Sequence, residues 1–83
     1  MARFIDVHSG MKGMTYQQLQ EAHQKDAATE ARDGVHFIKA WADPKAGKIF
    51  CLSEGPSREA VMNVHERSGH ATVEVYEVPL EVS

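Results

Sequence analysis

The sequence has 83 residues and a net charge of −3, from nine basic and twelve acidic residues. Hydrophobic residues make up 42% of the chain and charged residues 25%, a composition typical of a globular domain that excludes intrinsic disorder. The length predicts one domain over residues 1–83. The basic residues are dispersed, and no apolar run approaches the length of a membrane span. We therefore predict neither nucleic acid nor membrane as a partner.

The first half of the chain predicts a strand, a helix and a second strand. Apolar and polar side chains alternate over residues 3–8, which is the period of a strand. A capping box of Thr15 and Gln18 begins the helix, which we expect to run to about Arg32. Residues 35–41 then form the second strand.

The second half predicts two more strands with a helix between them. Residues 43–47 form a turn, so a third strand over residues 48–54 makes a hairpin with the second. A second helix begins at residues 55–57 and ends at Gly69. Alternation over residues 72–78 predicts the fourth strand.

The order βαββαβ predicts an α+β fold of the ferredoxin-like type. Right-handed crossovers place the first and third strands in the centre of a four-stranded antiparallel sheet, with both helices on one face. The third strand contains the unbroken apolar run Ile49-Phe50-Cys51-Leu52, whereas a strand with one face in water should alternate. We therefore predict that a second copy covers the other face, giving a homodimer of the dimeric α/β-barrel type.

Histidines are the candidate metal ligands of this chain. His23 and His65 lie on or beside the apolar stripes of their helices, and His8 ends the first strand. Imidazoles combined with carboxylates suit Ni, Cu, Zn or Fe. We predict a divalent-metal site of His8, His23 and His65 with Glu74 or Asp6 as the carboxylate. The alternative is that each histidine only hydrogen-bonds a nearby carboxylate or carbonyl.

The topology brings four side chains toward the same pole of the domain: His8, His65, His70 and Glu74. Two histidines, His36 and His70, have the pattern of surface residues. Cys51, the single cysteine, lies in the apolar run, where a small buried hydrophobic residue is the default interpretation. It cannot form a disulfide within the chain, and the N-terminal residues contain no secretory apolar region. We predict a cytoplasmic location.

Six segments between Phe4 and Val78 carry a resemblance to a known family: FIDVH, EAHQKD, DGVHFIKAW, GKIFCLSEGPSREAV, VHERSG and EVYEV. The chain resembles small proteins that contain a domain of unknown function and are described as nickel-binding, ferredoxin-like dimers. The resemblance implies metal ions bound near the dimer surface and a role in metal sequestration or homeostasis rather than turnover. The histidines that match the family pattern are His8, His23 and His65.

Two other functions stay open at this point. In a dimeric α/β-barrel enzyme of the monooxygenase or isomerase type, His8, Asp6 and His23 would be the general acid and base. A cavity of about 300 Å³ or more lined by these residues would favour it. The other is a structural or regulatory dimer without a small ligand. Of the three functions, we expect metal binding.

Overall fold

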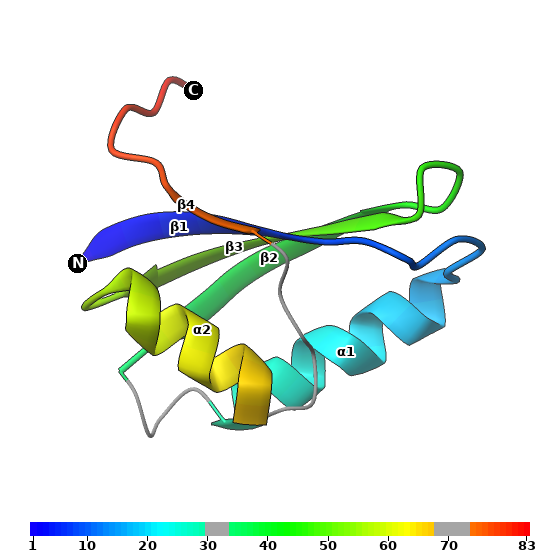
Figure 1. Cartoon of the computed structure of the whole chain (residues 1–83), viewed down its shortest axis with the longest axis horizontal. Helices are drawn as coiled ribbons and strands as arrows, with labels where there is room; N and C mark the ends of the chain where they lie inside the picture. Colours follow the sequence, from blue (N-terminus) through cyan, green and yellow to red (C-terminus); the bar gives the residue numbers. More distant parts are fainter. Residues whose placement is uncertain (30–33, 68–73) are drawn as a thin grey trace.

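The computed structural model describes residues 1–29, 34–67 and 74–83. Its strands form one antiparallel sheet in the order β2-β3-β1-β4. Both helices lie against the same face of this sheet (Figure 1). The predicted ferredoxin-like α+β fold is therefore confirmed. The elements in chain order are β1 (Ala2–His8), α1 (Tyr16–Thr29), β2 (His36–Asp43), β3 (Lys48–Gly55), α2 (Arg58–Arg67) and β4 (Glu74–Glu77).

Local hydrogen bonds explain where the helices begin. The Thr15 hydroxyl accepts a bond from the Gln18 amide at 3.2 Å, and the Gln18 side chain accepts one from the Thr15 amide at 3.0 Å. This is the predicted capping box. At α2, the Ser57 hydroxyl accepts from the Ala60 amide at 3.1 Å. The predicted helix ends near Arg32 and Gly69 lie outside the described residues.

The hydrophobic core lies between the helices and the sheet, mainly beneath α2. Strand β2 reaches this core with a register shift between Phe37 and Lys39. This irregularity explains why the apolar residues of β2 do not alternate cleanly in the sequence. The buried members of the core cluster are Phe4, Val35, Phe37, Val61, Val64 and Val75.

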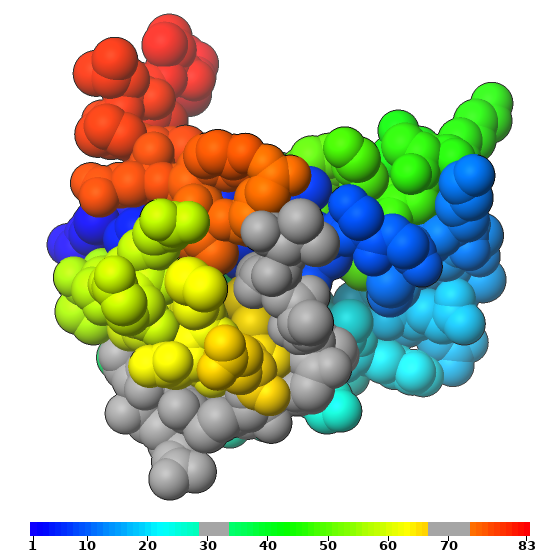
Figure 2. Space-filling model, viewed as in Figure 1, coloured from blue at the N-terminus to red at the C-terminus, as the bar shows by residue number. Residues whose placement is uncertain are grey.

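Neither α1 nor α2 lies over the opposite face of the sheet, which we call the outer face (Figure 1). Strand pairing places Ile5 opposite Leu52 and Tyr76, and Val7 opposite Phe50. Trp41 is paired with Phe50 and is 47% exposed. The C-terminal tail, residues 78–83, projects from the body (Figure 2) but contacts β1: the Val78 amide donates to the Arg3 carbonyl at 2.9 Å, and the Arg3 guanidinium donates to the Glu81 carboxylate at 2.9 Å. No helix among the described residues is long and apolar enough to cross a membrane.

Candidate metal centre

Asp6 is the hub of a buried polar cluster on the helix-covered face of the sheet. Its carboxylate accepts hydrogen bonds from two imidazoles: Oδ1 lies 2.9 Å from Nε2 of His8, and Oδ2 lies 2.7 Å from Nε2 of His65. His8 reaches Asp6 because residues two apart in a strand share a face. Asp6 and His65 are fully buried, and His8 is nearly so. The cluster therefore contains a carboxylate with both oxygens occupied.

The two imidazoles keep this buried carboxylate ionised. Burial by itself raises the pKa of Asp6, because the protein interior solvates a charge poorly. The hydrogen bonds from His65 and His8, with the positive charge of these rings, act in the opposite direction. Together they outweigh burial, and the pKa lies below its ordinary value of 3.8.

His65, on α2, lies between Asp6 of β1 and Asp26 of α1. It projects from α2, and its Nδ1 atom lies 3.5 Å from Oδ2 of Asp26 on α1. Its ring makes edge contacts with His8 and Phe37, at centroid distances of 4.8 Å and 5.1 Å. Asp26 is also buried. A line of carboxylate, imidazole and carboxylate thus runs from β1 through α2 to α1.

Cys51 adds a sulfur donor to the cluster. It lies directly opposite Asp6 in the pairing of β1 with β3, so both side chains point toward the helices. The candidate donor atoms of Asp6, His8 and Cys51 all lie within 4.8 Å of one another. Burial, reinforced by the negative charges of Asp6 and Asp26, raises the pKa of the Cys51 thiol far above its usual range. The thiol is therefore protonated in the metal-free protein.

This geometry suits a small divalent ion. Metal–ligand bonds of about 2.0–2.3 Å place donors around one ion at most roughly 4.5 Å apart. The group of Asp6, His8 and Cys51 is only slightly wider, so a small inward movement would bring all three into contact with an ion. A set with one oxygen, one nitrogen and one sulfur donor fits Ni, Zn or Cu and does not choose among them. Binding must release the Cys51 proton.

The four predicted ligands do not share one site within a single chain. His8 and His65 meet at Asp6. His23, on α1, lines a cavity that also reaches His8. Glu74 pairs with Val7 on the outer face, where it accepts a hydrogen bond from the Tyr76 hydroxyl. The metal-binding role of these four residues stays a prediction, and His70 lies outside the described residues.

The sequence pattern by itself does not indicate Cys51 as a candidate donor. It identified the residue as a buried hydrophobic one, and burial is correct, with 4% of the residue exposed. What it lacked was the register of β1 on β3, which places Cys51 against Asp6. The alternation of β1 is the available signal, since it already puts Asp6 and His8 on the same face as Phe4.

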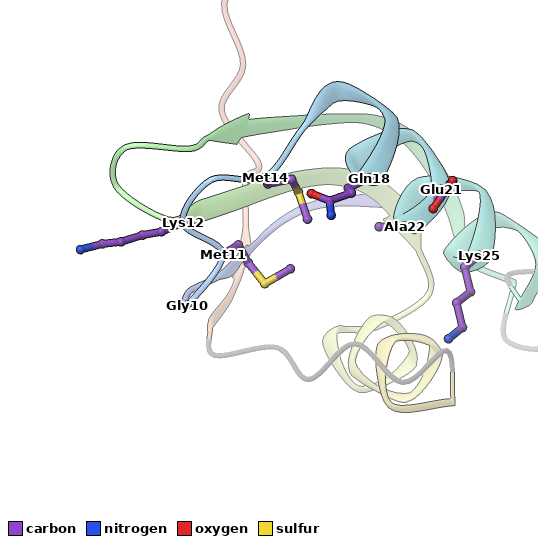
Figure 3. Close-up of a pocket in the computed structure, with 8 residues that line it drawn as sticks. All are labelled: Gly10, Met11, Lys12, Met14, Gln18, Glu21, Ala22 and Lys25. Atoms are coloured by element: carbon purple, nitrogen blue, oxygen red, sulfur yellow. The ribbon is translucent and has the colours of Figure 1, made fainter.

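A larger hollow of about 470 Å³ lies on the surface between the 10–14 loop and α1. The side chains of Met11, Met14 and Gln18 gather there, while Lys12 extends away from it (Figure 3). Among the described residues, its lining includes neither an imidazole nor a thiol and a single carboxylate, that of Glu21. The donors for a metal ion are therefore concentrated beneath the helices and not in this hollow.

Comparison with known proteins extends over nearly the whole chain. Residues 4–78 match the family described as "Nickel responsive protein SCO4226-like". A solved structure, described as the crystal structure analysis of SCO4226 from Streptomyces coelicolor A3(2), is similar at 59% sequence identity and a TM-score of 0.95. The match covers 98% of this chain and 100% of that chain. No curated protein matches the sequence. The matched region includes every strand and helix that contributes to the buried cluster.

Proposed function

Since the chain belongs to the SCO4226-like family of nickel-responsive proteins, we propose that it binds a divalent metal ion, with nickel as the first candidate, for sequestration or homeostasis. The ligands are Asp6, His8 and Cys51, and the carrying observation is their convergence within 4.8 Å in the protein interior. Burying an ionised carboxylate is costly, and apolar residues of similar volume often stabilise a core as well. A metal-binding role accounts for keeping these polar groups inside.

The other predicted residues have distinct places in this proposal. His65 orients Asp6 through the 2.7 Å hydrogen bond, as outer-shell partners of metal ligands commonly do. His23 supplies a further imidazole from α1, at the cavity that adjoins His8 and Cys51. For Glu74 to bind a metal, the remaining donors would have to come from the outer face or from a second molecule, because the sheet separates it from His8.

We also propose that two copies pair through the outer face. Trp41 and Tyr76 are about half exposed there, beside the apolar side chains of β1 and β3. Leu80 and Val82 of the tail are almost fully exposed. Burial of such surface stabilises association by roughly 25 cal/mol per Å² before the costs of docking. The buried free thiol of Cys51 supports a cytoplasmic location.

Calorimetric titration of the untagged protein with Ni²⁺, Zn²⁺ and Cu²⁺ tests the metal centre. We expect saturable binding near pH 7 that weakens toward about pH 5, because protons compete for the imidazole and the thiolate. Cys51→Ala should weaken nickel binding by at least about tenfold. Ser53→Ala is the matched control: Ser53 is equally buried, two residues along the same strand, and not part of the cluster. Equal affinity of both variants, or no heat with any of the three ions, would refute the proposal.

A further inference from the structure

A cavity of about 290 Å³ lies between α1 and the sheet. We infer that it binds a small, mainly apolar organic molecule with one hydrogen-bond-donating head group, of which phenol is a simple representative. Its volume is at the lower end of the range for ligand pockets, so only a compact molecule fits. This inference goes beyond metal binding and does not require it, although the cavity and the metal centre share His8 and Cys51.

Small side chains on both sides leave this space open. Ala22 of α1 and Ala40 of β2 line the cavity. The core beneath α2, by contrast, is filled by larger side chains such as those of Phe4 and Phe37. Leu19 and Ile49 complete apolar walls of the kind that most small-molecule sites have. The walls would therefore contact the apolar part of a ligand.

Polar groups gather in the same lining and define the head group. His8, His23 and Asp26 all border the cavity. The Nδ1 atom of His23 is buried and has no hydrogen-bond partner among the residues that the structure describes. A buried polar atom in this state requires an explanation, and a molecule bound beside His23 would supply one. His23 therefore has hydrogen-bonding capacity that the described fold does not use.

Negative charge beside the cavity favours a head group that donates a hydrogen bond. Asp26 borders it and Asp6 lies just behind His8, and both carboxylates are buried. Two buried negative charges favour a group that donates a hydrogen bond and disfavour an anion, because charges interact strongly away from water. A hydroxyl is thus preferred over a methyl group or a carboxylate at the same position of the ring.

The test is an NMR titration of ¹⁵N-labelled, metal-free protein in excess chelator with phenol, toluene and benzoate. We expect phenol to shift amide signals of the cavity-lining residues saturably. Toluene, which lacks the donor, should bind about tenfold more weakly, the effect of one hydrogen bond. Benzoate should bind more weakly still. No saturable shift with phenol, or equal binding of benzoate, would overturn the inference.

Variants separate this inference from the metal proposal. Ala22→Leu fills the cavity and should abolish the phenol response while nickel binding persists. Ala28→Leu, on the exposed side of the same helix, is the matched control and should change neither. Ala40→Val narrows the cavity from the sheet if Ala22→Leu does not fold. Cys51→Ala removes a metal donor and, because Cys51 also borders the cavity, enlarges the cavity by one sulfur atom without filling it, so phenol should still bind. Unchanged phenol affinity in both cavity-filling variants would refute the site.

Discussion

The two faces of the sheet differ in which groups they bury and expose. The helix-covered face holds Asp6, His65 and Asp26, none of which is more than 3% exposed. The outer face presents Trp41 and Tyr76 at about half exposure. Charged groups rarely occupy an interior without a partner or a metal, and large exposed apolar patches commonly mark an interface. The difference supports both proposals, metal binding on the covered face and association through the outer face.

Strand β1 contributes side chains to both the buried polar cluster and the outer face. In β1, Asp6 and His8 point toward the helices, and the intervening Val7 points to the outer face beside Phe50. A shift of one residue in the pairing of β1 would exchange the two sets of side chains. The pairing of β1 with β3 on one side and β4 on the other fixes this register.

Substitution of Asp6, at the centre of the buried polar cluster, is expected to have the largest effect on stability. Asp6→Asn removes the charge that His8 and His65 contact, and should lower the free energy of unfolding by about 3–5 kcal/mol. Urea unfolding of the metal-free protein measures it. Glu77→Gln, the same change at an exposed site in the neighbouring strand, should cost less than about 0.5 kcal/mol. A loss as small as in the control would mean that the cluster does not stabilise the fold.

A smaller effect is expected on the outer face. Leu52→Lys places a charge beside Ile5, and should weaken self-association by roughly 100-fold, or about 2.7 kcal/mol. The fold of each subunit should change little, because Leu52 is not part of the core cluster. Sedimentation velocity measures the association. Asn63→Lys adds the same charge to the exposed side of α2 and should leave it unchanged. A wild-type protein that sediments as a monomer would refute the pairing.

The smallest expected effect is a pH dependence of the stability that Asp6 contributes on the helix-covered face. Because the folded-state pKa of Asp6 lies below 3.8, its ionised form contributes stability above that pH. This contribution is lost as the pH falls through the folded-state pKa. The stability difference between wild type and Asp6→Asn should therefore narrow from about pH 4 toward about pH 2. Urea unfolding across this range measures it, and a constant difference would contradict the role of Asp6.

The fold was predictable because its signals are local. Alternation in β1, the capping box of Thr15 and Gln18, and the hairpin turn all depend on neighbouring residues, and each is present in the structure. The site was predictable only in part. The meeting of His65 with Asp6, 59 positions apart, depends on where α2 crosses the sheet, and the approach of Cys51 depends on strand register.

Glu74 illustrates a different difficulty. Alternation in β4 places it on the face opposite to Val75, and Val75 is the residue buried in the core. The sequence pattern therefore indicates the correct face of the sheet for Glu74. Position along the strands does not show this face, because His8 and Glu74 lie near the same end of the sheet but on opposite faces.

X-ray absorption at the nickel edge of the Ni²⁺-loaded protein tests whether Asp6, His8 and Cys51 hold the metal ion. A metal held beneath the helices by Cys51 and its neighbours must have a sulfur atom in its coordination sphere, at roughly 2.3 Å, together with nitrogen and oxygen donors. We predict this sulfur signal in the wild-type protein and its loss in Cys51→Ala. A spectrum with nitrogen and oxygen donors only would place the metal elsewhere and contradict the account.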